Sequence, residues 1–302
     1  MSNDSQGVTW PFQAMTFKTA KREVLDDYEA DDRFAFEQKM DGVRCMILVT
    51  EDGARQVVQR HGEPLKHAAS LIHVPDIFKA IGRPQKGWRF VLDGELMFDT
   101  GRYICFDMPS LTAPLMPAIT PNSPFAHRHR ALVSLWGYVF EDQERIGLVR
   151  HAQGAESKHL LVQTIKEING EGVLIKDLGA SYGMGARVGH SMKVKFTKTV
   201  DVIVLAVDQG RNEAGNLSGS IRFCLLPDGA TEFTDETTPA WYGSCSAIGR
   251  GDVQPGDVIE VEYLAYMAGG GIREPRMTRV RTDKNPGECT VAQFVEHSKM
   301  IL

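Results

Sequence analysis

A lysine, a carboxylate, a glycine and an arginine lie close together in the segment Lys39-Met40-Asp41-Gly42-Val43-Arg44. An unprotonated lysine amine is a nucleophile, and a neighbouring cation such as Arg44 favours the unprotonated form. A guanidinium can also hold a phosphate through two parallel hydrogen bonds. The segment therefore predicts attack by Lys39 on a phosphoanhydride, with Asp41 and Arg44 as further catalytic residues. The alternative is a surface β-turn with incidental charges.

The residues on either side predict the strands that would position this segment. Arg33–Gln38 alternates like a half-buried strand, with its phenylalanines on one face and Glu37 and Lys39 on the other. Gly42 suits a tight turn, and Cys45–Thr50 predicts the next strand. Glu37 and Lys39 are therefore expected to face one pocket.

Further short motifs follow in an order that resembles the covalent nucleotidyltransferases, the superfamily of ATP-dependent DNA ligases, RNA ligases and mRNA capping enzymes. Lys39-x-Asp41-Gly42-x-Arg44 is similar to the first motif of that family. The segments similar to its later motifs are Gln59–Gly62, Leu92–Leu96, Tyr103–Met108, Glu171–Lys176, Met192–Phe196 and Arg279–Lys284. The chain resembles small ATP-dependent DNA ligases of phage or bacterial type, which serve DNA repair, replication and recombination.

The resemblance implies ATP as a cofactor that becomes bound to Lys39 as covalent AMP. Glu37 is expected to accept a hydrogen bond from the exocyclic amine of adenine, a contact that the carbonyl of guanine would repel. Phe106 is the candidate platform on which the base stacks, since an aromatic face stacks on any base. The alternative for Phe106 is an ordinary core residue, and Trp136 is a rival platform.

Other residues are expected to contact the phosphates, the ribose and a metal ion. Lys193 and Lys195 project from one face if they lie on a strand, and the resemblance places them at the nucleotide phosphate. Glu171 and Glu95 offer oxygen ligands suited to Mg²⁺. The resemblance assigns Glu171 to the metal, and Glu95 to the ribose or a second metal. It assigns Arg60 to the ribose or the DNA 5′-phosphate.

The character of the sequence changes near residue 200. Short β-rich runs separated by glycine and proline predict a small closed barrel, for which the resemblance implies an OB-fold. The predicted fold is thus α+β, with an adenylation domain of mixed and antiparallel sheets at residues 1–199 and a C-terminal OB-fold domain at residues 200–302. Arg281 and Lys284 of this barrel are expected to close over the pyrophosphate and then move away to admit DNA.

Several local elements are predicted with their connections. Residues 51–54 read as a hairpin turn, and residues 88–98 pair with residues 101–108. Helices are expected at 68–81, interrupted by Pro75, at 126–135, and at 291–302. Residues 127–130 (His-Arg-His-Arg) are expected to point mostly outward, with the two histidines on a solvated face rather than at a metal.

Composition limits the class of protein. The 302 residues carry a net charge of −5, so grip on DNA must come from local basic clusters and is expected to be weak. No apolar run is long enough to span a membrane. The five cysteines show no metal-like spacing and indicate reduced thiols in the cytoplasm. We expect a monomer acting on nicked double-stranded DNA.

Three functions remain open from the sequence. Nick sealing is the leading interpretation. The second possibility is an RNA ligase or a GTP-using capping enzyme, since these share the Lys-x-Asp-Gly pattern. The third possibility is an OB-type nucleic-acid-binding protein without catalytic activity. The helical N-terminal DNA-binding domain of larger relatives is not visible before the first motif. Loops near residues 61–69 and 210–219 are expected to compensate for it.

Overall fold

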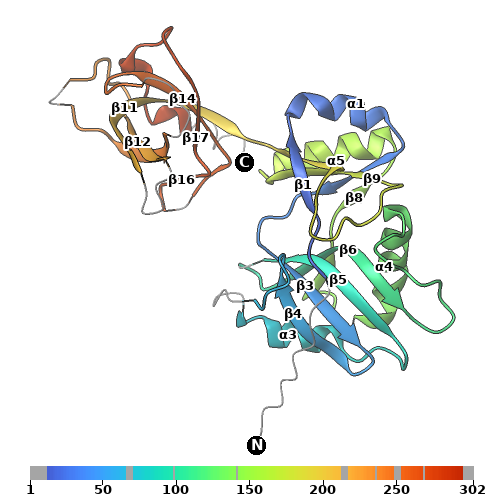
Figure 1. Ribbon diagram of the computed structural model, residues 1–302. Helices are drawn as coiled ribbons and strands as arrows, with labels where there is room; N and C mark the ends of the chain where they lie inside the picture. The colour runs from blue at the N-terminus through green and yellow to red at the C-terminus, as the bar shows by residue number, and fades with distance from the viewer. Residues whose placement is uncertain are drawn as a thin grey trace, which may run out of the picture. The chain divides into compact units, whose positions relative to one another are not determined.

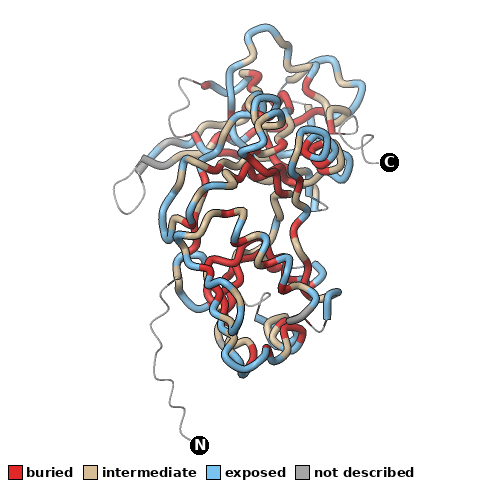
Figure 2. The backbone as a smooth tube through the Cα atoms, turned by 90° about the vertical axis from the view of Figure 1, so that its right-hand side faces the viewer, coloured by how far each residue is buried: buried red, intermediate tan, exposed pale blue. Residues whose placement is uncertain are grey.

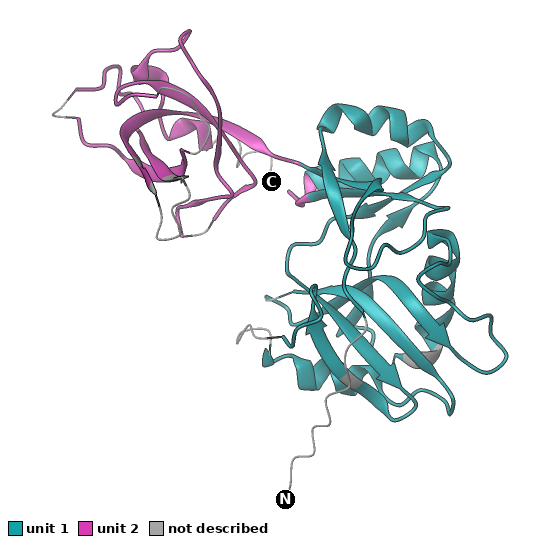
Figure 3. Cartoon of the chain, viewed as in Figure 1, with its two compact units in different colours: residues 1–166, 172–195 teal, residues 167–171, 196–302 magenta. Residues whose placement is uncertain are grey.

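The computed structural model describes residues 12–65, 71–97, 99–140, 142–211, 217–234, 237–247, 253–267 and 269–294. The chain divides into two compact units, shown in Figure 3. The first unit comprises residues 1–166 and 172–195, and the second comprises residues 167–171 and 196–302. Within the described ranges, no helix has both the length and the apolar character needed to cross a membrane.

The first unit contains two five-stranded sheets (Figure 1). The strand order of one is β1 (Thr16–Ala20), β10 (Arg187–Lys195), β9 (Gly172–Asp177), β2 (Phe34–Gln38) and β8 (His151–Ala152). The order of the other is β4 (Gly53–Gln59), β3 (Val43–Thr50), β5 (Arg89–Leu96), β6 (Tyr103–Thr112) and β7 (Ile146–Leu148). The β1–β10 and β6–β7 pairs are parallel and the other pairs are antiparallel, so the predicted mixture of strand directions is confirmed.

Short helices accompany these sheets. They are η1 (Arg22–Val24), α1 (Leu25–Ala30), α3 (Val74–Ile81), α4 (Phe125–Val139) and α5 (Ala155–Glu167). Apolar residues of α3 and α4 share one core cluster with β3, β5 and β6, so these helices cover one face of the second sheet. In Figure 1, α1 and α5 lie beside the first sheet, and Tyr28 of α1 packs edge-on against Phe34 of β2, with ring centroids 4.7 Å apart. Figure 2 shows the buried strands as red segments.

The expectation that β2 is half-buried is wrong, although the assignment of its faces holds. Every residue from Phe34 to Glu37 is buried. β2 lies between β9 and β8, with helices over its phenylalanine face. On the other face Glu37 meets Lys176 of β9, which itself lies near Asp107 of the second sheet. An internal strand covered on both faces buries both sets of side chains, which sequence alternation alone cannot reveal.

The second unit contains another five-stranded sheet, which is antiparallel throughout. Its strand order is β13 (Trp241–Ser246), β12 (Leu217–Leu225), β11 (Lys198–Arg211), β14 (Val258–Tyr263) and β17 (Arg276–Val280). A small ribbon of β15 (Ala265–Tyr266) and β16 (Ile272–Arg273) and the turn η2 (Pro286–Glu288) complete it. Among the described residues no ladder joins β13 to β17, so closure into a barrel is not shown.

Local predictions have mixed outcomes. The hairpin at residues 51–54 and the β5–β6 pair are confirmed. α3 begins at Val74, and Pro75 lies in its first turn. N–H groups in the first turn have no hydrogen-bond partner within the helix, so proline is tolerated there. Pro75 therefore lies at the start of this helix rather than interrupting it. β13 had not been predicted. Parts of the two loops expected to compensate for a missing domain, residues 66–69 and 212–216, lie outside the described residues. Most of the predicted terminal helix also lies outside them.

Candidate functional site

Lys39 lies in the turn between β2 and β3, and neighbouring strands fix this turn from two sides. The backbone N–H of Lys39 donates to the carbonyl of Gly172 on β9 at 2.8 Å. The N–H of Gly42 donates to the Glu95 carboxylate on β5 at 3.3 Å. A Cβ at position 42 would collide with the carbonyl oxygen of Leu96, so the turn requires glycine there. These contacts fix the backbone of the turn that carries Lys39.

Glu95 is the carboxylate that the fold brings to this turn. In the β3–β5 register Arg44 pairs with Glu95, which places the first and third motifs side by side. Burial raises the pKa of Glu95 to about 7, while the charges of Lys39 and Arg44 and the Gly42 N–H act in the opposite direction. Glu95 therefore changes its charge near neutral pH.

This pKa makes a prediction about stability. Between about pH 4.5 and 7 the folded protein keeps a proton on Glu95 that the unfolded chain has lost, so stability falls as pH rises through this window. We expect the free energy of unfolding to contain a component of roughly 2–3 kcal/mol that is lost between pH 5 and pH 8 and is missing in Glu95→Gln. Urea titrations of both proteins at the two pH values measure it. An equal pH dependence in both proteins would contradict the assignment.

Arg44 is committed to a buried carboxylate in this arrangement. Its guanidinium donates to both oxygens of Asp93, at 3.0 and 2.6 Å, and to the Met15 carbonyl at 2.6 Å. The Tyr182 hydroxyl also donates to Asp93, at 2.6 Å. Burial alone would lower the pKa of Arg44, but the charge of Asp93 outweighs burial and raises it. The guanidinium edge expected to hold a phosphate is thus paired with Asp93.

The candidate phosphate lysines lie on the same sheet face as Glu37. Lys193 of β10 pairs with Leu174 of β9, and Leu174 also pairs with Glu37 of β2. Directly paired residues in antiparallel strands point to the same face, so Glu37 and Lys193 share one face. Lys195 follows two residues later and points the same way. Both lysines are half-buried.

Phe106, rather than Trp136, lies among the candidate site residues. Phe106 is buried on β6, and the Arg44 guanidinium carbon lies 5.1 Å from its ring centroid. Trp136 of α4 packs against Phe140, at a centroid distance of 4.5 Å, and against the core cluster under α3 and α4. Phe106 belongs to a separate small apolar cluster with Ile104 and Val149, bordered by Met40 and Met97.

A chain of four buried charges links Glu37 to α4. Lys176 Nζ lies 3.4 Å from Glu37 Oε2 and 3.8 Å from Asp107 Oδ2. Arg128 donates to both oxygens of Asp107, at 2.8 and 3.0 Å. Burial alone would raise the pKa of Asp107, but Arg128 and Lys176 outweigh it and lower the pKa. The expectation that Arg128 points outward is wrong, because pairing with Asp107 allows its full burial.

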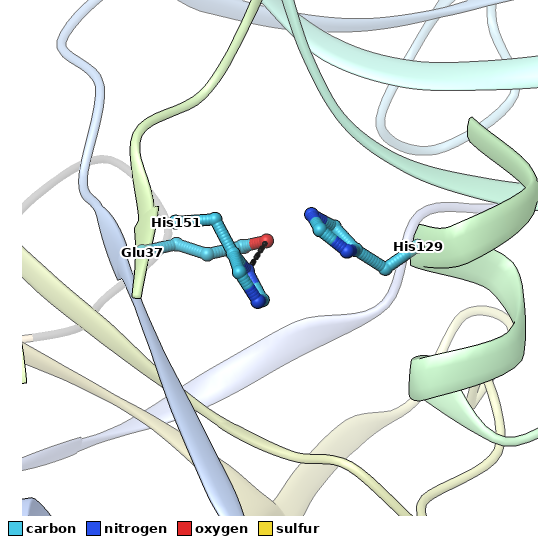
Figure 4. Close-up of side chains that lie close together, drawn as sticks. All are labelled: Glu37, His129 and His151. Carbon is cyan, nitrogen blue, oxygen red and sulfur yellow. Dashed lines mark hydrogen bonds and ion pairs between the residues drawn. The ribbon is translucent and has the colours of Figure 1, made fainter. Parts of the chain in front are cut away.

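Two histidines complete the surroundings of Glu37 (Figure 4). His151 Nδ1 lies 3.4 Å from Glu37 Oε1, and the His129 ring stacks on that of His151 with centroids 3.8 Å apart. Burial and the neighbouring His151 lower the pKa of His129 to about 4. His129 is half-buried within this cluster, so its expected place on a solvated face is wrong.

The ligand atoms of Glu37, His129 and His151 lie within 4.8 Å of one another, as at some metal sites. Two features argue against a cation there. The imidazole planes are only 19° from parallel, so their in-plane lone pairs do not converge well. The Lys176 ammonium next to Glu37 already balances its charge, so a divalent ion would add uncompensated buried charge. We therefore assign no metal to this cluster.

Glu171 and Arg60 occupy different settings. Glu171 is buried and directly precedes β9, and its carbonyl accepts a hydrogen bond from the Phe196 N–H at 3.0 Å. It is next in sequence to Gly172, which binds the Lys39 N–H. Arg60 is exposed just after β4, and its Nε lies 2.8 Å from His61 Nε2. Asp41 is exposed in the Lys39 turn.

Within the second unit, Arg281 and Lys284 meet at one carboxylate. Arg281 donates to both oxygens of Asp201, at 2.9 and 3.1 Å, and Lys284 Nζ donates to Asp201 at 2.6 Å. Arg281 also donates to Asp283 through two nitrogens at 2.8 Å, and these hydrogen bonds are the main reason for the lowered pKa of Asp283. Asp201 was not anticipated from the sequence.

The residues that sequence reasoning missed fall into two groups. Asp93, Asp107 and Lys176 lie inside the recognised motifs, so their positions were visible while their partners were not. His151 and Tyr182 lie outside every motif. Only the packing of distant segments brings these two to the site, and nothing local in the sequence marks them.

The chain is similar to known proteins in both sequence and fold. Residues 11–120 match the family model described as the ATP dependent DNA ligase domain. A "Probable DNA ligase" of Streptomyces griseus is 29% identical over 313 residues, covering 86% of this chain and 59% of that protein. A "Probable DNA ligase" of Kineococcus radiotolerans is 27% identical, covering 86% and 58%. The chain thus spans less than two thirds of the length of these curated relatives.

Solved structures show the same fold at low sequence identity. The ligase domain of LigD from M. tuberculosis is 17% identical with a TM-score of 0.51, covering 92% of this chain and 98% of that one. A structure from a study of Lig E DNA ligases, described as binding DNA with a minimal scaffold, is 16% identical with a TM-score of 0.57, covering 89% and 99%. The chain therefore shares the fold of these ligase structures.

Proposed function

We propose that the chain is an ATP-dependent DNA ligase that seals nicks in double-stranded DNA through a Lys39–AMP intermediate, a proposal that its similarity to the ATP dependent DNA ligase domain and to proteins named as DNA ligases supports. The observation that carries the proposal is the rigid turn holding Lys39, bound to β9 through its own N–H and to Glu95 through Gly42. Phosphoryl-type transfer depends chiefly on positioning and on neutralising oxygen charge. The fixed turn supports the positioning of Lys39, and Lys193 and Lys195, on the same sheet face as Glu37, are proposed to neutralise the oxygen charge.

The first step joins Lys39 to AMP. The neutral amine attacks the α-phosphorus of ATP, the bond from that phosphorus to the bridging oxygen breaks, and pyrophosphate leaves with the bond electrons while the amine loses its proton. Lys193 and Lys195, which share a sheet face with Glu37, are proposed to neutralise the phosphate. Glu37 and Phe106 are proposed to hold the adenine, and Arg60 the ribose or the DNA phosphate.

The next steps use DNA as substrate. An oxygen of the 5′-phosphate attacks the phosphorus of Lys39–AMP and releases the lysine amine. The 3′-hydroxyl at the nick then attacks the activated 5′-phosphorus, forms the phosphodiester and releases AMP. Asp41, which is exposed in the Lys39 turn, is proposed to meet the incoming 3′-hydroxyl. Arg44, paired with Asp93, acts by fixing the strand that follows the turn.

Glu95 and Glu171 are proposed as the residues that would hold Mg²⁺. Both offer hard carboxylate oxygens, the donors that this ion prefers. The pKa of Glu95, about 7, allows it to ionise at neutral pH, and a nearby cation would favour that form. When bound, Mg²⁺ supplies positive charge against the phosphate oxygens.

Intact-mass spectrometry tests the central claim. The purified chain is incubated with ATP, Mg²⁺ or both, and then with a nicked duplex. We expect a mass increase of one AMP only when both are present, and sealing of the duplex. Labelling by GTP instead of ATP would indicate a capping-type enzyme, sealing of RNA alone an RNA ligase, and DNA binding without any adduct a non-catalytic protein.

We expect Glu171→Ala to slow adenylylation by roughly 100-fold or more at limiting Mg²⁺, because the transition state loses charge neutralisation. Excess Mg²⁺ should recover part of the rate, and the thermal midpoint should change little if the role is in metal binding. The matched control is Glu167→Ala, an exposed glutamate at the end of α5. Normal adenylylation by Glu171→Ala at limiting Mg²⁺ would assign Glu171 a structural role only.

We propose that the second unit is a five-stranded OB-type domain that works as a hinged lid carrying Arg281 and Lys284. Its antiparallel sheet and alternating buried residues are compatible with such a barrel. The enzyme is proposed to act as a monomer on nicked DNA. The five cysteines are free and buried, which suits a reducing cytoplasm.

A further inference from the structure

We propose that Lys176 is a positioning residue that decides which nucleobase the site accepts. This inference rests on the proposed function, in which Glu37 binds the edge of adenine and Phe106 stacks on its face. A single ammonium group, that of Lys176, contacts both of these side chains. Lys176 can therefore position both Glu37, which is proposed to bind the edge of adenine, and Phe106, which is proposed to stack on its face.

The sheet register places Lys176 beside Glu37. Lys176 of β9 pairs with Ala35 of β2, whereas Glu37 pairs with Leu174, so the two charged residues are diagonal neighbours on one face. The Lys176 ammonium lies 3.4 Å from Glu37 Oε2, and its side chain is 2% exposed. This is a buried pair, which water screens little.

The Lys176 ammonium has little freedom to move. Three phenylalanine rings surround it, with centroids at 4.5 Å for Phe125, 5.1 Å for Phe17 and 5.8 Å for Phe106. Cations are attracted to aromatic rings at such distances. Its other carboxylate neighbour, Asp107, already accepts two hydrogen bonds from Arg128. The main electrostatic partner of the Lys176 ammonium is therefore the Glu37 carboxylate.

Glu37 retains spare capacity to accept a hydrogen bond. Its Oε1 faces His151, and its Oε2 is the one buried side-chain oxygen that lacks a hydrogen-bond partner among the described residues. An ionised carboxylate only accepts hydrogen bonds, so it favours an exocyclic amine and repels a carbonyl. Without Lys176 the buried carboxylate would lose the ammonium beside Oε2 and the contact that fixes its position, so its edge would discriminate less between an amine and a carbonyl.

Single-turnover adenylylation with ATP and with ITP tests this inference, since ITP carries a carbonyl in place of the amine. We expect the wild-type protein to prefer ATP by roughly 100-fold or more. Lys176→Met should reduce this preference by about tenfold or more, because ITP gains relative to ATP. Lys176→Arg, which keeps the charge, should retain most of the preference.

Lys158→Met is the matched control, because Lys158 is also a buried lysine of the first unit. Its ammonium donates to the carbonyls of Tyr28, Asp31 and Phe34. We expect a lower thermal midpoint in this variant and an unchanged ATP to ITP ratio. If Lys176→Met does not fold, Lys176→Gln provides the same comparison.

Two outcomes separate the inference from the proposed function. Equal losses with ATP and ITP in the Lys176 variants, leaving the ratio within about twofold, would overturn the positioning role while adenylylation itself stands. No adduct with either nucleotide in the wild-type protein would overturn the proposed function and the inference with it. A ratio that falls in Lys176→Met and stays constant in Lys158→Met supports the assignment.

Discussion

Lys39→Ala is expected to lose covalent AMP attachment completely, because no other group replaces the attacking amine. The turn that holds Lys39 is fixed by backbone hydrogen bonds and by Gly42, so removing the side chain should leave the fold intact. Labelled ATP followed by denaturing electrophoresis measures the adduct. Lys39→Arg should be equally inactive, since a guanidinium remains protonated and is a poor nucleophile.

Two controls make this result specific. Lys79→Ala removes an exposed lysine of α3 and should leave labelling unchanged. Sealing of DNA that already carries AMP does not need the lysine as nucleophile, so Lys39→Ala should retain measurable activity in that assay. Undiminished labelling of Lys39→Ala by ATP would show that the nucleophile is another residue.

Arg281→Ala combined with Lys284→Ala is expected to slow enzyme adenylylation by roughly 100-fold or more, and sealing of pre-adenylylated DNA by only a few-fold. If these cations orient the departing pyrophosphate, only the first step loses stabilisation, because sealing releases no pyrophosphate. In the structure both cations bind Asp201, so the proposed lid action requires these bonds to be exchanged for phosphate contacts. Single-turnover rates of the two steps measure the effect.

The controls address stability and general DNA affinity. Removing both cations leaves Asp201 without these partners, so thermal midpoints must be compared, and Arg281→Lys with Lys284→Arg tests whether charge alone is enough. Arg222→Ala with Arg276→Ala removes the same charge from exposed positions of β12 and β17 and should affect neither step strongly. Similar rate losses in both steps, with a strong dependence on salt concentration, would indicate that Arg281 and Lys284 bind DNA phosphates rather than the pyrophosphate.

The sequence by itself determined the order and identity of the chemical groups. Lys39, Gly42 and Glu95 stand in short motifs: the turn needs glycine at position 42, and the proposed reaction would need an amine and carboxylates. These requirements act over a few residues. Strand alternation also assigned Glu37 and the two phenylalanines of β2 to opposite faces correctly. Such properties are local, and so a local pattern can reveal them.

Only the tertiary structure decided the partners of these groups. Arg128 looks like a surface residue in its helix and is instead buried against Asp107, and Arg44 meets Asp93 rather than presenting a free edge. Lys176 reaches Glu37 because β9 pairs with β2 across a long sequence separation. The energy of a buried charge depends on which opposite charge the fold places within a few ångströms, and no property of neighbouring residues in the chain contains that information.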